Sequence, residues 1–407
     1  MKRINKRVFL DYASTTPVDR LVYKAMKPFW TRNFGNASAL YEEGMNNSKI
    51  IEESRGQVAR ITGVRPGEII FTGSGTESNN LALMGILNGL EFDDNFLFDN
   101  WREKLKNKKI DFITSTIEHP AIIEPLIFLD YQKKINLQKI AVLGNGKINL
   151  DEFKSKLNKD TLLVTFILAN NEIGVIQSIR KIKSIIKKFK NELGRRFDEP
   201  PFFHTDASQA PLYLDINIDR LGVDMMTLDG SKINGPKGIG CLIKKSYVPL
   251  GNIIFGGGQE FGLRPGTENV PLIVGFSKAL ELANQNRGRR ADVLRKLQEY
   301  FLEQIDLKLK PKNSEIKING SQKERLPNNI NICIPGLNSE FAVIQLDEKG
   351  IACSAMTACK NISENSTSYV VDALGYDCGQ SSLRFTLNEK TTRKEINFAI
   401  NALFDII

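Results

Sequence analysis

The sequence has 407 residues, of which 41% are hydrophobic and 25% are charged, and its formal net charge is +9. These proportions are those of a globular protein, and no apolar run reaches the roughly 18 residues that a membrane-spanning helix needs. A chain of this length forms two domains, or one large α/β domain with an appendage.

The number of cysteines and the N-terminal sequence indicate the cellular location of the protein. The N-terminus is basic but has no apolar segment behind it, so no secretory signal is expected. The five cysteines are few and odd in number, and Cys353 and Cys359 have five residues between them rather than the two of a metal-binding motif. We therefore expect a cytoplasmic location, with no membrane association and no metal site.

The net positive charge raises the possibility of a nucleic-acid partner, because clustered lysines neutralise phosphates. The densest basic stretch is IRKIKSIIKKFKNELGRRF, at 179–197. Its apolar residues keep helical spacing and its lysines fall on the other face, so we interpret it as the solvated face of a helix packed on a sheet. Direct nucleic-acid binding is not expected. A tRNA-contacting role remains the alternative, which charge reversal at Lys183, Lys187 and Lys190 would test.

From residue 48 onward, predicted helices alternate with short apolar or β-branched runs. Helices are predicted at 48–63, 76–87 and 180–193, and strands within 68–75, 108–116, 161–171, 200–208, 224–231 and 238–245. This alternation indicates a layered α/β domain with a mostly parallel sheet. Two charged or aromatic stretches, 92–109 and 192–203, are interpreted as surface insertions. After about residue 285 a charged helix and further short elements indicate a second, smaller α/β domain.

Polar residues and glycines gather where the predicted strands end, which is the edge at which parallel sheets bind ligands. The turn TGSGTES precedes a helix and suits an anion, although a simple helix cap explains it equally well. Asp206 follows another strand as an N-cap or a functional acid, and Asn171 ends the most apolar run. Lys232, in a glycine-rich turn, is either solvated or a Schiff-base lysine. A lysine, an acid and an anion pocket form the set that pyridoxal phosphate needs.

Ten motifs together carry a resemblance to a known family. In chain order they are VFLDYASTTPVD, TGSGTESNNLAL, IEHPAI, NNEIGVIQ, HTDASQA, GSKINGPKGIG, GGGQEFGLRPGTENV, LPNNIN, GIACSAMTAC and SSLRFTL, from residue 8 to about residue 390. They resemble the cysteine desulfurases of the class V aminotransferase family. The resemblance implies a homodimer with the fold of type I pyridoxal-phosphate enzymes. That fold has a large three-layer α/β/α domain with a mostly parallel sheet, here 18–285, and a smaller α/β domain, here 1–17 and 286–407.

The same resemblance assigns roles to single residues. It implies that Lys232 binds the cofactor covalently, that Asp206 keeps the pyridinium nitrogen protonated, and that His119 stacks on the ring and transfers protons. The other implied cofactor contacts, to the phenolic oxygen or to a phosphate, are Asn171, Gln209, Gly75, Thr76, Ser231 and, across the dimer, Thr267. Arg384, together with Asn171, would bind the substrate carboxylate, for which a planar guanidinium is suited.

The implied activity converts L-cysteine to L-alanine and loads the sulfur onto an enzyme cysteine. GIACSAMTAC places Cys359 at the position of the nucleophile and Cys353 at an ordinary one. A lone cysteine is more often a small buried hydrophobe, but Cys359 lies in a polar stretch, and Lys360 beside it can favour the thiolate. The persulfide would pass to an acceptor protein, either an iron–sulfur scaffold or a tRNA-thiolation enzyme.

Some residues depart from the family's pattern. Asp229 and Ser231 stand in DGSK where the family usually has Ser-Gly-His-Lys. An anion at Asp229 would repel a phosphate, so we expect its side chain to point elsewhere. Met356 and Lys360 replace smaller residues in the cysteine loop, and Phe261 stands where an arginine is common. None of these changes removes a group that the chemistry needs.

Two rival functions stay open at this point. The first is another enzyme on the same scaffold, such as a selenocysteine lyase or an aminotransferase-like protein. The thiol of Cys359 favours desulfuration over transamination, because transamination needs no thiol. A catalytically silent scaffold for sulfur-transfer partners is the other, and it would lack the colour of a bound cofactor. Of the two histidines in the chain, His204 is interpreted as a packed neighbour of Asp206 rather than as a catalytic group.

Overall fold

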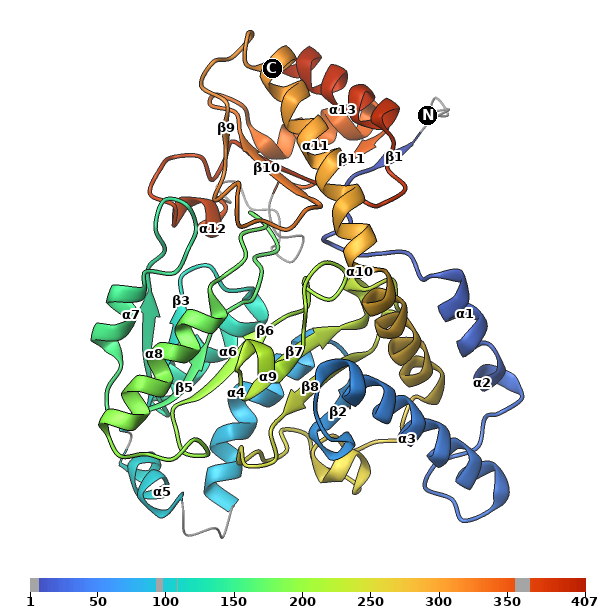
Figure 1. Ribbon diagram of the computed structural model, residues 1–407, viewed down its shortest axis with the longest axis vertical. Coiled ribbons are helices and arrows are strands. Elements are labelled where there is room, and N and C mark those ends of the chain that lie inside the picture. The colour runs from blue at the N-terminus through green and yellow to red at the C-terminus, as the bar shows by residue number, and fades with distance from the viewer. Residues whose placement is uncertain (1–6, 93–97, 108, 356–366) are drawn as a thin grey trace.

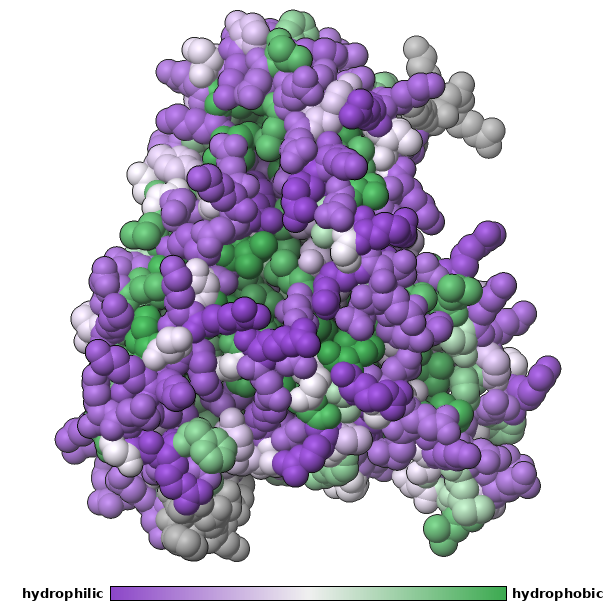
Figure 2. Space-filling view, viewed as in Figure 1, coloured by the Kyte–Doolittle hydropathy of each residue, from purple (hydrophilic) through white to green (hydrophobic). Residues whose placement is uncertain are grey.

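The structure is a computed structural model that describes residues 7–92, 98–107, 109–355 and 367–407. Figure 1 shows a large body built on a central sheet, a smaller body above it, and the long helix α10 (Val270–Gln304) running from one to the other. Figure 2 shows a mostly hydrophilic face, with hydrophobic residues gathered near its centre, where the two bodies meet.

The large body contains a seven-stranded sheet. Its strands, in spatial order, are β2 (Ile69–Thr72), β8 (Gly240–Lys244), β7 (Met225–Asp229), β6 (Phe202–Asp206), β5 (Thr161–Thr165), β3 (Asp111–Ser115) and β4 (Asn136–Ile140). The strands from β7 to β4 pair in parallel, and β8 is antiparallel to both of its neighbours. The mostly parallel sheet predicted from the sequence is therefore confirmed.

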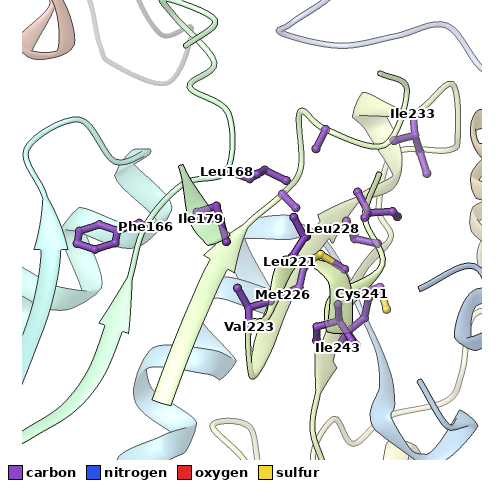
Figure 3. Packing of buried hydrophobic residues seen from close by; sticks show 14 of the residues in the cluster. Phe166, Leu168, Ile179, Leu221, Val223, Met226, Leu228, Ile233, Cys241 and Ile243 are labelled. Carbon is purple, nitrogen blue, oxygen red and sulfur yellow. The ribbon is translucent and has the colours of Figure 1, made fainter. Parts of the chain in front are cut away.

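Helices cover both faces of this sheet. On one face lie α4 (Gly75–Phe92), α5 (Asp99–Lys106) and α6 (Pro120–Tyr131). On the other lie α3 (Glu42–Thr62), α7 (Leu150–Lys156), α8 (Ile179–Glu192), α9 (Ile218–Leu221) and the first half of α10. Side chains alternate along each strand, so Phe202 joins the first cluster and Phe203 the second. Figure 3 shows part of the second cluster, where Met226 of β7 packs near Cys241 of β8. The three-layer prediction is confirmed.

The small body has a core of its own. Its three-stranded antiparallel sheet has the order β12 (Ser382–Thr386), β10 (Asn329–Cys333) and β9 (Lys317–Ile318), packed with α11 (Ser339–Glu348), α13 (Arg393–Ile406) and the second half of α10. β1 (Val8–Phe9) pairs in parallel with β11 (Ile351–Ala352), which holds the N-terminal segment on this body. The predicted boundary at residue 285 falls inside α10, and the division into domains stays a prediction. The remaining helices are α1 (Arg20–Met26), α2 (Pro28–Thr31) and α12 (Tyr369–Asp372).

The two predicted surface insertions are only partly at the surface. The first contains α5, whose Trp101 is buried in the cluster that α4 and α6 form. The second ends with Phe202 and Phe203, which are fully buried because they open the central strand β6. Each stretch therefore contributes aromatic residues to the core, while others, such as Phe197, remain exposed.

Two cysteines that are distant in the sequence meet in the small body. Cys333, at the end of β10, forms a disulfide with Cys378, just before β12, across 45 positions of the chain. Their spacing matches no local motif, so the sequence did not indicate this pairing. Among the described residues, none of the helices is both long and apolar enough to cross a membrane. No group of three or more potential metal ligands is found in that part of the chain either.

Candidate active site

A cavity opens at the carboxyl ends of the parallel strands, where the small body meets the large one. Most of the residues predicted from the sequence surround it. It is lined by Ala13, Ser14, Gly75, Thr76, Asn79, His119, Ala121, Ile167, Asn171, Asp206, Ser208, Gln209, Asp229, Lys232 and Arg384. The edge that the sequence analysis selected is therefore the edge at which the polar side chains converge.

Lys232 enters the cavity from the turn that follows β7. The turn is a short helix of Gly230–Lys232, and a Cβ at Gly230 would lie 2.8 Å from the carbonyl oxygen of Pro236, so only glycine fits there. The Lys232 ammonium donates to the backbone carbonyl of Ser14. A reactive amine is thus fixed between the end of a central strand and the N-terminal segment.

Asp206 ends β6, and two donors hold its carboxylate. Asn79, on α4, donates through Nδ2 to Asp206 Oδ2 over 2.8 Å, and the backbone N–H of Ser208 donates to Oδ1 over 2.9 Å. Asn79 is 1% exposed, and its Oδ1 has no hydrogen-bond partner. These two donors fix the orientation of the Asp206 carboxylate at the cavity wall.

His119 is both a helix cap and a cavity residue. It precedes α6, and its Nδ1 accepts a hydrogen bond from the backbone N–H of Ala121 over 3.1 Å. Burial lowers the pKa of His119, against an opposing effect of the Asp206 charge. Because Nδ1 accepts, the proton of the neutral ring lies on Nε2. His119 is therefore a neutral ring at the cavity wall whose Nε2–H can donate a hydrogen bond.

His204 is the packed neighbour that the sequence predicts. It is fully buried in β6, with its two ring nitrogens 2.9 Å from Thr165 Oγ1 and 3.1 Å from Thr227 Oγ1. Burial lowers the pKa of His204 to about 4, so the ring is neutral at physiological pH. It joins three neighbouring strands and does not line the cavity.

Arg384 reaches the cavity from β12 of the small body and is 2% exposed. Its Nη2 donates to Asp11 Oδ1 over 2.7 Å and to Ser14 Oγ over 2.8 Å, and its Nη1 donates to the backbone carbonyl of Asn171 over 2.9 Å. Asp11 offsets the cost of burying the guanidinium charge. The Arg384 Nε atom is buried without a hydrogen-bond partner, so the side chain still has donor capacity for a carboxylate.

The start of α4 departs from the sequence prediction. The backbone N–H of Gly75 donates to Asp229 Oδ2 over 3.0 Å, while the Ser231 N–H and Oγ–H donate to Asp229 Oδ1 over 2.7 Å and 2.6 Å. The expectation that the Asp229 side chain points elsewhere is therefore wrong. Free N–H groups at a helix N-terminus need an acceptor, and Asp229 satisfies one of them.

The remaining predicted residues lie at different distances from the cavity: Gln209 is at its wall, Ser231 is beside it, and Thr267 is elsewhere. The Gln209 amide donates to the carbonyl of Ala13 over 2.9 Å at the cavity wall. Ser231 lies beside the cavity, bound to Asp229. Thr267 is exposed and lines a different hollow, with Gly238 and Ile239, so this chain does not bring it to its own active site. Cys359, Lys360 and Met356 lie outside the described residues.

The described cysteines are poorly suited to act as thiolates. Cys241 and Cys353 are buried, and burial raises the pKa of Cys353 to about 12 and that of Cys241 as well. Cys333 and Cys378 are joined to each other. A nucleophilic thiolate requires a lowered pKa and access to substrate, and none of these four residues combines the two.

Comparison with known proteins agrees with this geometry. The class-V aminotransferase family pattern matches residues 8–398. The chain belongs to the class-V aminotransferase family. A cysteine desulfurase IscS of Dictyoglomus turgidum is 36% identical over 406 residues, which cover 99% of this chain and 95% of that protein. A cysteine desulfurase IscS 1 of Archaeoglobus fulgidus is 36% identical over 401 residues, covering 98% and 96%. The chain is therefore an enzyme of the cysteine desulfurase branch of this family.

Solved structures support the same conclusion for the fold. A NifS-like protein superposes with a TM-score of 0.84 and 29% identity, covering 98% of this chain and 99% of that one. A NifS-like protein from Rickettsia africae gives a TM-score of 0.81 at the same identity. The predicted type I fold of pyridoxal-phosphate enzymes is confirmed.

Proposed function

We propose that this chain converts L-cysteine to L-alanine with pyridoxal phosphate and transfers the sulfur to Cys359. The observation that carries the proposal is that Lys232, Asp206 and Arg384 line one cavity although they come from separate parts of the fold. An amine, an acid and a buried guanidinium are the groups needed to bind a carbonyl cofactor and an amino acid together.

The described residues fit the cofactor. Lys232 would hold its carbonyl carbon, Asp206 its ring nitrogen, and His119 one face of its ring, with Asn171 and Gln209 available for the phenolic oxygen. The Asp229 carboxylate bound at the start of α4 indicates that an anion is accepted there, where the phosphate would lie near Gly75 and Thr76. When bound, pyridoxal phosphate supplies an electron sink for negative charge at the substrate Cα.

The residues of the chain would orient the substrate, transfer protons and hold the cofactor. Arg384, together with Asn171, orients the substrate through its carboxylate, because the guanidinium is already fixed by Asp11 and Ser14. Lys232 Nζ would remove the proton from the substrate Cα, and the His119 side chain would stack on the cofactor and assist proton transfer. Asp206 would hold the ring nitrogen of the cofactor, with its carboxylate oriented by Asn79 and the Ser208 N–H.

Sulfur transfer requires a thiolate, and we assign it to Cys359. Its sulfur attacks the substrate sulfur, the substrate Cβ–S bond breaks, and the electron pair of that bond leaves with the carbon fragment, which is protonated to alanine. Cys359 keeps the sulfur as a persulfide. The burial or pairing of the four described cysteines supports this assignment. The persulfide would then pass to an iron–sulfur scaffold or to a tRNA-thiolation enzyme.

Paired cysteine variants test the proposal. We expect the purified wild-type protein to show visible cofactor absorbance and to form alanine and sulfide from L-cysteine with a reductant. Cys359→Ser should keep the absorbance and lose more than about 100-fold in alanine formation, because the nucleophile is gone. Cys353→Ser is the matched control and should stay near wild type, since Cys353 is buried.

Two outcomes would contradict the proposal. Full persulfide formation in Cys359→Ser would refute the assigned nucleophile. A protein without visible absorbance, and with none restored by added pyridoxal phosphate, would favour a silent scaffold instead.

A further inference from the structure

Asp229 is the acidic residue that departs from the family's pattern, and its side chain lies in the part of the cavity where an anion fits. Its two carboxylate oxygens accept from Gly75 N–H, Ser231 N–H and Ser231 Oγ–H over 2.6 to 3.0 Å. The contact with Gly75 is tight, since Asp229 Oδ2 would lie 3.0 Å from a Cβ built there. The carboxylate thus stands in the position of an external anion at the N-terminus of α4.

The donors that Asp229 uses are those that a phosphate would need. Gly75 N–H lies at the start of α4, next to Thr76, and Ser231 Oγ–H lies on the short helix Gly230–Lys232 that follows β7. A phosphate that binds these donors must displace the carboxylate or lie next to it. Because both groups are anions, their repulsion in a half-buried site opposes binding.

We propose that Asp229 is a built-in competitor of the cofactor phosphate, so that cofactor binding is weakened and coupled to the uptake of a proton. The inference rests on the proposed use of pyridoxal phosphate and adds to it a control of cofactor loading. It predicts a protein that is readily found without cofactor at higher pH and is loaded more easily as the pH falls.

Other charged groups of the described residues border the cavity. Lys232, on the short helix that Asp229 precedes, donates to the carbonyl of Ser14, and Asp206, at the end of β6, adds a second negative charge. At the start of α4, Glu77 accepts from Gly73 N–H and forms an ion pair with Arg264, so Arg264 is already neutralised. His119 faces the same cavity from the start of α6 as a neutral ring.

The direction of the pH effect follows from these charges. A phosphate monoester takes up its second proton near pH 6, so above that pH it carries two negative charges. Placed beside the Asp229 carboxylate, the dianion is destabilised more than the singly charged phosphate. Affinity for the phosphate should therefore fall as the pH rises from about 6 to about 8.

The experiment uses cofactor-free full-length protein and two probes without a carbonyl, pyridoxine 5′-phosphate and pyridoxine. Neither probe can react with Lys232, so the ratio of their affinities reports the phosphate alone. Binding is measured by calorimetry at about pH 6 and about pH 8 for the wild type, Asp229→Asn and Asp229→Ser. Asp151→Asn, an exposed acid far from the cavity, controls for net charge.

We expect Asp229→Asn to bind pyridoxine 5′-phosphate at least about tenfold more tightly than the wild type near pH 8, with a smaller gain near pH 6. Pyridoxine should bind all variants alike, and Asp151→Asn should match the wild type. Asparagine keeps an acceptor for Gly75 N–H, and Asp229→Ser gives a second measurement if the first variant folds poorly.

Other results overturn the inference. If both Asp229 variants bind the phosphate probe as the wild type does, or more weakly, then Asp229 is neutral or helpful and the idea is wrong. The proposed function survives that result as long as pyridoxal phosphate binds and desulfuration proceeds. If no variant binds pyridoxal phosphate at all, the proposed function fails, and this inference fails with it.

Discussion

Burial sets the protonation state of a second acid behind the active site. Glu118 directly precedes His119 and is 0% exposed. Its Oε1 accepts from Ser115 Oγ and from the backbone N–H of Ile167, while its Oε2 has no hydrogen-bond partner. Burial, together with a smaller effect of the nearby Asp206 charge, raises the pKa of Glu118 to about 8. Glu118 is therefore protonated at neutral pH.

This raised pKa links folding stability to pH. In the unfolded chain Glu118 ionises near its ordinary pKa of 4.5, whereas in the folded chain it ionises near 8. Its contribution to stability is complete below the unfolded value and is lost as the pH rises toward the folded value. We predict that Glu118→Gln, which is neutral at every pH, is more stable than the wild type near pH 9 by about 2–4 kcal/mol.

Urea unfolding of both proteins at about pH 5 and about pH 9 measures the effect. The two free energies of unfolding should nearly agree at the lower pH and separate at the higher one. Glu124→Gln, which removes an exposed acid from α6, is the matched control and should leave the pH dependence unchanged. An equal pH dependence in Glu118→Gln and the wild type would mean that Glu118 is ionised in the folded protein.

Residues embedded in a specific motif could be predicted from the sequence, and residues that act through a neighbour could not. Lys232, Asp206 and Arg384 each have a chemistry that their motif indicates, and the structure brings them to one cavity. Asn79 and Asp11 also lie inside quoted motifs, but their roles depend on the partner that folding brings to them. The expectation that the Asp229 side chain points away from the anion site rested on charge alone and ignored the unsatisfied N–H groups of α4.

At the scale of elements, a buried ion pair fixes the loop between β8 and α10. Glu260 has a positive φ of 48°, and both of its carboxylate oxygens accept from Arg55 of α3 over 2.8 Å. One of these oxygens also accepts from the backbone N–H of Phe71 in β2. The Arg55 guanidinium lies 5.0 Å from the ring centre of Phe261. The segment leading to Thr267 is thereby attached to the edge of the sheet.

We predict that Glu260→Ala lowers the free energy of unfolding by about 3–5 kcal/mol, because it removes the buried carboxylate partner of Arg55 and the acceptor of the Phe71 N–H, and leaves Arg55 paired only with the exposed Glu52. The double variant Arg55→Met with Glu260→Leu should recover much of the loss, since no buried charge remains. Urea unfolding of the three proteins provides the measurement.

An exposed ion pair serves as the control for this prediction. Asp306→Ala removes the partner of Lys310 at the surface and should cost less than about 1 kcal/mol. If Glu260→Ala cost no more than Asp306→Ala, the pair would not hold the loop.

The periodicity of the sequence located six strands and the helices α3, α4 and α8 of the large body, but it did not locate α5, α6, α7, α9 or β4. The strands β2, β3, β5, β6, β7 and β8 lie within the predicted ranges because their runs are buried on both faces. The edge strand β4 was missed, since its sequence NLQKI is mostly polar and largely exposed. The helix predicted after residue 285 is the second half of α10, and local pattern alone cannot show that it continues from Val270.

At the scale of the whole molecule, Thr267 indicates how two copies of the chain would be arranged. The resemblance assigns it to the phosphate of the other subunit, and in the single chain it is exposed and lies outside the active-site cavity. Its loop is nevertheless fixed by Arg55 and Glu260. A fixed, outward-facing hydroxyl is suited to completing a neighbour's site in the proposed homodimer.

Complementation between two impaired chains tests that arrangement. The Lys232→Ala and Thr267→Ala variants are co-expressed with different tags and purified as mixed dimers. We predict that each mixed dimer has one intact site, in which the Thr267→Ala chain supplies Lys232 and the Lys232→Ala chain supplies Thr267. The mixed dimer should bind pyridoxal phosphate at that site with wild-type affinity and show about half of the wild-type desulfurase activity, since one of its two sites lacks the lysine. The Thr267→Ala homodimer should bind the cofactor about tenfold more weakly. If the mixed dimer bound it as weakly as that homodimer, Thr267 would act within its own chain or not at all.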